Sequence, residues 1–422
     1  MSGCGGKGGD KPLTDCCSQP GLMPFEQALA QLLDSVQGGK QPVEKVHLTA
    51  ALGRVLAEDL CAELDVPPAD NSAMDGYAVR VADLAAAAGK PLTISQRIPA
   101  GVDPEPLQPG TVARIFTGAS VPEGADAVVM QENTERDGEQ VKMPTEIPLG
   151  DHIRRRGQDI ANGDAVVKAG TRLQPQHLGV LASIGIAELP CYRPLRVALL
   201  SSGDELAQPG EVAGPGQIYN SNRYSLTGLI QQLGMELIDL GTIEDTRAAT
   251  IEALQGAAEK ADLLITSGGV SVGEEDHIKA AVEQLGEISL WKLAIKPGKP
   301  LAFGRVGQTP FIGLPGNPVS AMLCFQVLAR PVMMKLQGAG ELHPKSVMLP
   351  IDYQRSKAQK RREYLRVRRV EQDGQLVLKP YTNQSSGVLT SVAWAEGYAV
   401  IPADAQIAAG DRVEFIPFSE LA

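Results

Sequence analysis

Apolar and polar positions follow different patterns in successive parts of the chain. Near the N-terminus, apolar side chains recur at the spacing of one helix face: Phe25, Ala28, Leu29, Leu32, Leu33 and Val36. This spacing predicts a packing helix. From Val46 to about Glu146 the apolar runs are short and β-like, as in TVARIF and ADAVVM, and segments such as IPAG and VPEG separate them. That pattern predicts a small β-rich module.

From about Leu195 an apolar run, a Gly-rich loop and a helical pattern follow one another three times. RVALL precedes SSGDE, DLLIT precedes SGGVSVGEED, and PFIGL precedes PGNPVS. Two helices are predicted in this part: TRAATIEALQGAAEK, with Thr246 as its N-cap, and DHIKAAVEQLG, from Asp276 to Gly286. The alternation predicts a doubly wound α/β domain around a mainly parallel sheet.

The helical period disappears after about Val347. The remaining apolar runs are short and predict strands: VMLPIDY, EYLRVRRV, QLVLKPY, GYAVIP and DRVEFIPF. They indicate a final small β domain that resembles a barrel. We therefore expect a multidomain chain of α/β and β parts, divided into a disordered tail (1–21), a linking region with helical content (22–60 with 147–190), a β-rich module (61–146), an α/β domain (191–344) and a C-terminal β domain (345–422).

Composition narrows the class of protein. The 422 residues include 45 glycines and 30 prolines but only 4% aromatic residues, so turns and close backbone approaches must be frequent. With 43% hydrophobic residues and no apolar run near the roughly 18 residues that span a bilayer, global disorder and membrane insertion are excluded. A net charge of −11 predicts no general attraction to nucleic acid or to an anionic membrane.

The N-terminus and the cysteines add two expectations. Residues 1–21 contain no continuous apolar segment, so we expect no secretory signal and a cytoplasmic location. The six cysteines show no CxxC spacing, and Cys4, Cys16 and Cys17 lie in a Gly-rich tail that favours disorder over a soft-metal site. The five histidines are scattered, and neither HExxH nor a local Ser-His-Asp signature occurs, which disfavours a zinc enzyme or a triad hydrolase.

The three Gly-rich loops are the best candidates for a site, because ligands bind beyond the carboxyl ends of parallel strands. In the first loop, Ser202 and Gly203 offer anion-binding groups next to the carboxylates of Asp204 and Glu205. The second and third loops combine small residues with acids or prolines: Ser267, Gly268 and Gly269 before Asp276, and Pro315 and Pro318 before Ser320. One such loop alone is most often an ordinary turn, but three together favour phosphate with Mg²⁺.

Basic and polar clusters lie elsewhere in the chain, each with a simpler alternative. Lys292, Lys296 and Lys299 surround a Pro-Gly turn and suit a multiply charged anion, or are surface lysines. The Arg154–Arg156 cluster suits a phosphate or a solvated turn, and the strand run with Arg366 is most simply a solvated face. The Asp70–Tyr77 turn and Thr117 are rich in hydrogen-bonding groups, with Asx-turn chemistry as the alternative.

Eight motifs occur in order from about residue 22: DNSAMDGYAVR, IFTGASVPEGADAVVMQE, RRRGQDI, SSGDEL, IYNSN, LITSGGVSVGEEDH, KPGKPLAFG and GLPGNPVSAM. With these motifs the chain resembles the MoeA family, the molybdopterin molybdenumtransferases, and is similar to the E domain of gephyrin. The resemblance implies the last step of molybdenum cofactor synthesis, in which molybdate enters the dithiolene of adenylylated molybdopterin and AMP is released with Mg²⁺ as cofactor. It also implies an elongated homodimer, a MogA-like α/β domain, and MogA-type adenylyltransferases and molybdoenzymes as further partners.

The same resemblance assigns roles to residues of the matching motifs. It implies that Asp75, Thr117 and Asp159 approach the α/β domain of the partner subunit. Glu205, Asp245 and Asp276 are the implied acids of the α/β side, with Glu205 and Asp276 as ligands of Mg²⁺. The expected substrate-binding residues are Ser202, Gly203, Ser267, Gly268, Gly269, Lys292, Lys296, Lys299, Pro315, Pro318, Ser320 and Arg366.

Two other functions remain open at this stage. An adenylyltransferase that makes adenylylated molybdopterin has a similar α/β domain, although the motifs around Asp75 and Thr117 argue against it. A scaffold protein that binds the pterin without turnover is the second alternative, and the complete set of acidic and basic residues disfavours it. For the enzyme we hypothesise that a molybdate oxygen attacks the adenylate phosphorus while Mg²⁺ and lysine neutralise the developing charge.

Overall fold

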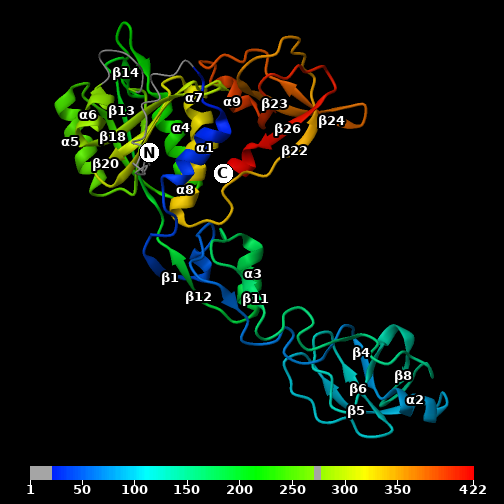
Figure 1. Cartoon of the computed structure of the whole chain (residues 1–422). Helices are drawn as coiled ribbons and strands as arrows, with labels where there is room; N and C mark the ends of the chain where they lie inside the picture. Colours follow the sequence, from blue (N-terminus) through cyan, green and yellow to red (C-terminus); the bar gives the residue numbers. More distant parts are fainter. Residues whose placement is uncertain (1–20, 270–276) are drawn as a thin grey trace, which may run out of the picture.

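The computed structural model of the chain describes residues 21–269 and 277–422. The described part is elongated (Figure 1): the α/β domain and the C-terminal sheet lie side by side at one end, the β-rich module lies at the other, and the linking region connects them. The expected tail falls outside the described residues except for Gly21, and so does Asp276.

The α/β domain contains a six-stranded sheet of order β16-β13-β17-β21-β20-β18. Its first four strands are parallel, whereas β20 is antiparallel to both of its neighbours. The strands are β13 (Arg196–Ser202), β16 (Glu236–Ile243), β17 (Leu263–Ser267), β18 (Gly286–Lys292), β20 (Pro300–Val306) and β21 (Thr309–Leu314). The predicted, mainly parallel sheet is confirmed, and RVALL, DLLIT and PFIGL are adjacent strands within it.

Each face of this sheet carries its own layer of helices. Val197 and Leu199 share a core with α1 (Phe25–Asp34), α4 (Ser221–Gln232), α7 (Pro318–Cys324) and α8 (Arg330–Gln337). Ala198 and Leu200 pack on the other side with α5 (Arg247–Ala258) and α6 (His277–Leu285). Because successive side chains of a strand point to opposite faces, the continuous apolar run is buried on both sides, as a doubly wound sheet requires.

Local signals fix the ends of these helices. The side chain of Thr246 accepts a hydrogen bond from the N–H of Ala249 and caps α5 as predicted, and α6 ends one residue before Gly286. A π-helical turn, η4 (Phe325–Ala329), joins α7 to α8. The run Pro318–Gln337 is the one described helix that is long and apolar enough to cross a membrane, but 89% of its most apolar window is buried inside the protein, as in the core helix of a globular domain.

The C-terminal sheet has the order β19-β23-β25-β26-β22, and β24 pairs with β23. Its elements are β22 (Val347–Pro350), β23 (Arg362–Gln372), β24 (Gln375–Pro380), α9 (Thr390–Trp394), β25 (Gly397–Ile401), β26 (Arg412–Pro417) and η5 (Phe418–Leu421). The α/β domain lends β19 (Ile295–Lys296), which pairs in parallel with β23. One bridge joins Ile351 to Leu378. The five predicted strands are confirmed, and the barrel-like closure stays a prediction.

The β-rich module contains a sheet of order β7-β4-β6-β5-β9-β8. Its elements are β4 (Gly76–Val79), α2 (Val81–Ala87), β5 (Leu92–Ile98), β6 (Thr111–Ile115), β7 (Ala127–Met130), η3 (Gln131–Asn133), β8 (Glu135–Asp137) and β9 (Gln140–Lys142). Tyr77 and Val79 belong to the core on one face and Ala78 to the core on the other. The module lies far from the α/β domain of its own chain (Figure 1).

Two chain segments run through the linking region and pair with each other. Its elements are β1 (Val43–His47), η2 (Leu48–Ala50), β2 (Leu60–Cys61), β11 (Ala165–Val167), α3 (Pro175–Ser183) and β12 (Glu188–Tyr192). The pair of β3 (Asn71–Ser72) and β10 (Ile153–Arg154) lies against the β-rich module, where Ile153 packs on its core. β1 is antiparallel to β12, with Val43 opposite Tyr192. One packing detail differs from the expected division, because α1 buries Ala28 and Leu32 in the core of the α/β domain.

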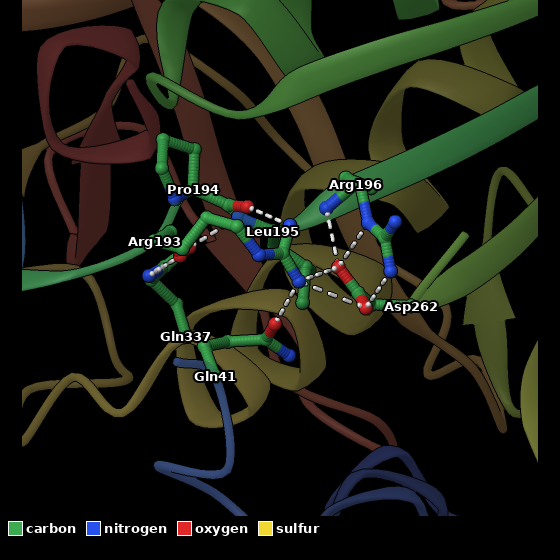
Figure 2. Close-up of polar contacts among 7 residues, drawn as sticks. All are labelled: Gln41, Arg193, Pro194, Leu195, Arg196, Asp262 and Gln337. Atoms are coloured by element: carbon green, nitrogen blue, oxygen red, sulfur yellow. Dashed lines mark hydrogen bonds and ion pairs between the residues drawn. The ribbon is translucent and has the colours of Figure 1, made fainter. Parts of the chain in front are cut away.

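A charged cluster fastens the linking region to the α/β domain (Figure 2). The Asp262 carboxylate accepts hydrogen bonds from the Arg193 guanidinium at 2.9 Å and from the main-chain N–H of Arg196 at 2.8 Å. Arg193 also donates to the Gln41 side chain, and Gln337 donates to the carbonyl oxygen of Arg193. Burial alone would raise the pKa of Asp262, but the hydrogen bonds from Arg196 and Arg193 outweigh it and hold the pKa below 3.8.

Candidate active site

A cavity of about 1060 Å³ lies at the carboxyl edge of the parallel strands, between the α/β domain and the C-terminal sheet. We call it the anion pocket. The three Gly-rich loops, the turn after β19, the short strands β14 (Leu206–Ala207) and β15 (Ile218–Tyr219) and the start of α4 contribute to its wall. Its polar and glycine lining residues are Ser202, Glu205, Asn220, Ser221, Asn222, Ser267, Gly268, Gly269, Lys296, Gly298, Lys299, Gly316, Asn317, Ser320, Arg361, Gln384, Ser385, Ser386 and Gly387.

The first loop brings a hydroxyl and two acids together. Buried Ser202 donates a hydrogen bond of 2.7 Å from its Oγ to Asp245. The carboxylate of exposed Glu205 covers Gly203, where a Cβ atom would lie 2.3 Å from Oε2 of Glu205. The positive φ of Gly203, 143°, makes a side chain there still less tolerable. Ser202 and Glu205 line the pocket, whereas Gly203 supports the turn between them.

Asn222, at the start of α4, ties the second loop to the third. Its Nδ2 donates to Oγ of Ser267 at 2.7 Å and to the carbonyl oxygen of Gly316 at 2.7 Å. The predicted residues Gly268 and Gly269 line the pocket beside Ser267, as do Pro315, Pro318 and Ser320 of the third loop. The carboxyl ends of adjacent parallel strands meet at one edge, which is why loops far apart in sequence form one wall.

The pocket's cationic side comes from Lys296, Lys299 and Arg361. Lys299 is exposed, whereas the Lys296 ammonium lies 2.7 Å from the buried carboxylate of Glu363. Between the two lysines, Gly298 has a φ of 99°, and a Cβ atom there would lie 2.6 Å from Sγ of Cys324. Burial raises the pKa of the Cys324 thiol to about 12, so the thiol stays protonated and unreactive and packs against the turn.

A loop of the C-terminal domain, Gln384–Gly387, closes the opposite wall. Buried Arg366 holds this loop: its Nη2 donates to the carbonyl oxygen of Ser385 at 3.2 Å and its Nε to Oγ of Ser391 at 3.1 Å. Gln384 in turn accepts from the main-chain N–H of Arg366 at 3.0 Å. Arg366 is 1% exposed, so the solvated strand face was the wrong interpretation, and its side chain supports the pocket without lining it.

Lys292 is the third predicted substrate residue, after Gly203 and Arg366, that does not line the pocket. It ends β18 and is exposed, and it is absent from the lining although Pro300 of β20, its partner in register, belongs to it. The Pro-Gly turn predicted that the three lysines face one anion, but Lys292 ends the regular strand β18 whereas Lys296 and Lys299 belong to β19 and to the turn after it. A strand and a turn present their side chains differently, so Lys292 is separated from Lys296 and Lys299.

The predicted residues of the β-rich module and its connection form a separate group. The carboxylate of Asp75 accepts hydrogen bonds of 2.8 Å from both the main-chain N–H and the hydroxyl of Thr117. These bonds, the main-chain one first, hold the pKa of Asp75 below its ordinary value. Asp159 bonds through its main-chain N–H to the carbonyl oxygen of Val66. None of the three lines the anion pocket of its own chain.

The acids near the pocket include candidate ligands of Mg²⁺. Glu205 lines the pocket and Asp245 lies behind Ser202, while Asp276, the second predicted ligand, is outside the described residues. Within residues 21–269 and 277–422 no three metal-ligating side chains of His, Cys, Asp or Glu gather in one place. Mg²⁺ usually takes one or two carboxylates together with substrate phosphates, so these acids fit an ion that a phosphate helps to hold.

Sequence reasoning missed several pocket residues. Asn222 lies in the quoted motif IYNSN, but the sequence predicted no role for it or for Arg361. The loop Gln384–Gly387 was not recognised, although the polar run NQSSG between two apolar segments is a signal that marks it as an exposed loop. This loop lies near Ser320 because the C-terminal domain packs against the α/β domain. The local sequence pattern does not reveal that packing.

Three family models match the chain, one after another. The "MoeA N-terminal region (domain I and II)" matches residues 23–185, the "Probable molybdopterin binding domain" residues 198–335, and the "MoeA C-terminal region (domain IV)" residues 351–418. The middle match covers the three Gly-rich loops of the anion pocket, and the last covers Arg361 and Gln384–Gly387.

Relatives and solved structures agree over almost the whole chain. The molybdopterin molybdenumtransferase of Haemophilus influenzae is 39% identical over 95% of this chain and 100% of its own length. Molybdopterin molybdenumtransferase 2 of Mycobacterium tuberculosis is 38% identical over 87% of this chain and 93% of its own. The crystal structure of the MoeA protein from Pyrococcus horikoshii OT3 has a TM-score of 0.80 at 29% identity and covers 94% of this chain. The chain therefore belongs to the MoeA family.

Proposed function

We propose that this protein is a molybdopterin molybdenumtransferase, which inserts molybdenum from molybdate into adenylylated molybdopterin and releases AMP. The observation that carries the proposal is the anion pocket. Three loops of small residues meet there beside Lys296, Lys299 and Arg361. Small residues let the backbone approach phosphate oxygens closely, and lysine and arginine neutralise them. The activity named for the relatives in Haemophilus and Mycobacterium supports the same reading.

The residues of the pocket suit the task of holding two anions that repel each other. Within the part of the chain that the structure describes, neither Lys299 nor Arg361 makes an ion pair with a carboxylate, so both are available to ligands. Ser320, 3% exposed, offers a hydroxyl group to the pocket, whereas the hydroxyl proton of Ser202 is donated to Asp245. In the proposed reaction a molybdate oxygen attacks the adenylate phosphorus, the pyrophosphate bond breaks and the molybdopterin phosphate leaves, while the nearby cations stabilise the charge that develops there. The dithiolene thiols then displace AMP and an oxygen, as water, from the molybdenum of the adenylyl-molybdate.

Mg²⁺ is part of the proposal. Glu205 and Asp276 would hold it together with a phosphate of the substrate, and Asp245 would orient Ser202 beside them. When bound, the ion supplies positive charge to the pyrophosphate group during its cleavage. The test is AMP release by EDTA-treated protein before and after Mg²⁺ is restored. Equal rates in the two samples would remove the metal from the proposal.

A homodimer is also proposed, with the β-rich module of one subunit at the anion pocket of the other. The Asp75–Thr117 pair is supported by short hydrogen bonds yet lies in a module remote from the pocket of its own chain (Figure 1). A mixture of Asp75→Asn and Lys299→Ala proteins tests the arrangement. Each variant alone should be nearly inactive, whereas mixed dimers should regain activity because they hold one intact site. Subunit exchange between the two variants must first be demonstrated. If the exchanged mixture then regains no activity, the shared site is refuted.

One assay separates the proposed function from its two alternatives. Purified protein is incubated with adenylylated molybdopterin, Mg²⁺ and molybdate, and AMP is measured. Molybdate-dependent release of AMP supports the transferase, consumption of ATP supports an adenylyltransferase, and binding without turnover supports a scaffold. Glu205→Ala should abolish release at saturating substrate, and Glu211→Ala is a matched control from the same segment outside the pocket lining.

The remaining proposals concern the location of the protein in the cell and its protein partners. A cytoplasmic location and contacts with a MogA-type adenylyltransferase and with molybdoenzymes are supported by the sequence resemblance. Fractionation of cells that carry a tagged chain, followed by crosslinking and identification of neighbours, tests both. Recovery in a secreted or membrane fraction would contradict the location, and the absence of any molybdenum-cofactor protein among the neighbours would contradict the partners.

A further inference from the structure

Lys296 differs from the other cations of the anion pocket because a buried carboxylate faces it. Its Nζ lies 2.7 Å from Oε1 of Glu363, and the Glu363 side chain is only 4% exposed. The Lys296 side chain itself is 37% exposed and lines the pocket. Its ammonium group is therefore partly neutralised from the protein side before a ligand enters.

Arg355 holds the same carboxylate from the other side. Its Nη1 lies 3.4 Å from Oε2 of Glu363, and its side chain is equally buried. Nη2 of Arg355 donates to the carbonyl oxygens of Pro402 and Ala405 at 2.7 and 2.8 Å. Backbone pairing reinforces the arrangement, since Lys296 of β19 lies opposite Glu363 of β23 in the parallel register. The carboxylate is thus fixed in place and cannot swing away when a ligand arrives.

This arrangement sets the charge of the pocket. Lys296, Glu363 and Arg355 together carry one net positive charge. Removal of the Glu363 charge would raise that to two, right beside a pocket-lining lysine. The electrostatic effect on a ligand grows in proportion to the ligand's own charge, and the low exposure of Glu363 limits screening by salt. A more negative ligand therefore responds more strongly to the presence of Glu363.

We propose that Glu363 is a specificity-determining residue of the anion pocket: it restrains the binding of highly charged anions relative to the dianion molybdate. Glu363 is absent from the lining and touches no ligand, so it acts through Lys296. The inference rests on the proposed function of the pocket. The charge of Glu363 lets a pocket rich in cations release phosphate-bearing ligands, so that these ligands do not displace molybdate.

The test measures dissociation constants of molybdate and of inorganic pyrophosphate by equilibrium dialysis at 50 and 200 mM salt. Glu363→Gln should bind molybdate more tightly, by roughly fivefold to tenfold at the lower salt, and pyrophosphate by a larger factor. Glu363→Asp keeps the charge and should stay close to the wild type. Glu414→Gln is the matched control, because Glu414 pairs with neighbouring Arg362 and does not line the anion pocket.

Two further variants keep the test decisive if Glu363→Gln folds poorly. Arg355→Gln leaves the carboxylate with Lys296 alone and should weaken pyrophosphate binding more than molybdate binding. The double variant of Glu363→Gln and Arg355→Gln restores the net charge and should return both constants to within about threefold of the wild type. Weaker or unchanged anion binding by folded E363Q, or tighter binding by R355Q, would overturn the inference.

The wild type and Lys299→Ala separate this inference from the proposed function. If K299A binds molybdate as tightly as the wild type does, the anion pocket is not the molybdate site and the proposed function fails with it. If K299A loses affinity while E363Q equals the wild type for both anions, only the role of Glu363 fails.

Discussion

Asp262→Asn should destabilise the α/β domain more than any loss of a surface ion pair. The Asp262 side chain is 15% exposed, and two guanidinium groups and one main-chain N–H share its carboxylate. An asparagine keeps the shape but turns an amide N–H₂ toward groups that can only donate. Arg193 and Arg196 then lose their counter-charge at the point where the linking region enters the sheet (Figure 2).

The size of the effect follows from burial. Removing one partner of a buried ion pair costs about 3–5 kcal/mol, but Arg196 is 36% exposed and its share is screened by solvent. We therefore expect a loss of about 3 kcal/mol in the free energy of unfolding. For a domain of this size that corresponds to a fall of about 9 °C in Tm, at about 3 °C for each kcal/mol.

The assay is urea unfolding followed by the fluorescence of Trp291, which lies in the α/β sheet, in a Trp394→Phe background. Asp239→Asn is the control, because Asp239 lies on the edge strand β16, is 32% exposed against 15% for Asp262, and among the described residues pairs with only one guanidinium, that of Arg223. It should cost only about 1 kcal/mol. A loss below 1 kcal/mol for D262N, or equal losses for the two variants, would refute the argument from burial.

The pH dependence gives a second check with a defined sign. The folded-state pKa of Asp262 is depressed below 3.8, so its contribution to stability is full above that value and is lost as the pH falls through the folded pKa. The difference between the wild type and D262N should therefore stay constant above about pH 4 and shrink at lower pH. A difference that grows on acidification would mean that the carboxylate is not held ionised by its arginines.

Three more predictions concern the anion pocket and three cysteines of the described residues. Lys299→Ala should raise the dissociation constant for molybdate at least tenfold, as measured by dialysis, with Tm unchanged because Lys299 is exposed. Gly298→Ala should lower stability by about 2 kcal/mol or more in thermal melts, since the positive φ and the Sγ atom of Cys324 both oppose a Cβ atom. Iodoacetamide at pH 8 should label exposed Cys61 in the folded protein and spare Cys191 and Cys324, as peptide mapping by mass spectrometry would show. Molybdate affinity retained in K299A, an unshifted melt of G298A or early labelling of Cys324 would each contradict its prediction.

The periodic parts of the fold were predictable because they depend on local rules. Apolar runs with β-branched residues became the central strands, and a threonine before a helical stripe became the cap of α5. Placing the three Gly-rich loops in one site needed only the rule that parallel strands end at a common edge. That rule correctly joined Ser202, Ser267 and Ser320, which lie far apart in the sequence.

The failures share one physical origin, which is contact between segments that have no local relation. Alternation along β23 correctly suggests which side chains share a face, but only the packing of α9 and of the loop Gln384–Gly387 shows that Arg366 is covered while Arg368 is exposed. In the same way, the carboxylate that faces Lys296 comes from a strand of the next domain. No period in the sequence encodes such a pairing.

The pairing of β1 with β12 has a consequence for how the gene could be rearranged. Val43 and Tyr192 lie opposite each other in antiparallel register, which puts their Cα atoms about 5 Å apart. The whole arm from 43 to 192 thus leaves and rejoins the body at nearly one point. A short peptide joining residues 42 and 193 would span that gap without rerouting the body's chain, so a version of the protein without the arm can be designed. Such a design would also have to replace the contacts of Arg172 with the carbonyl oxygens of Ala422 and Gln232.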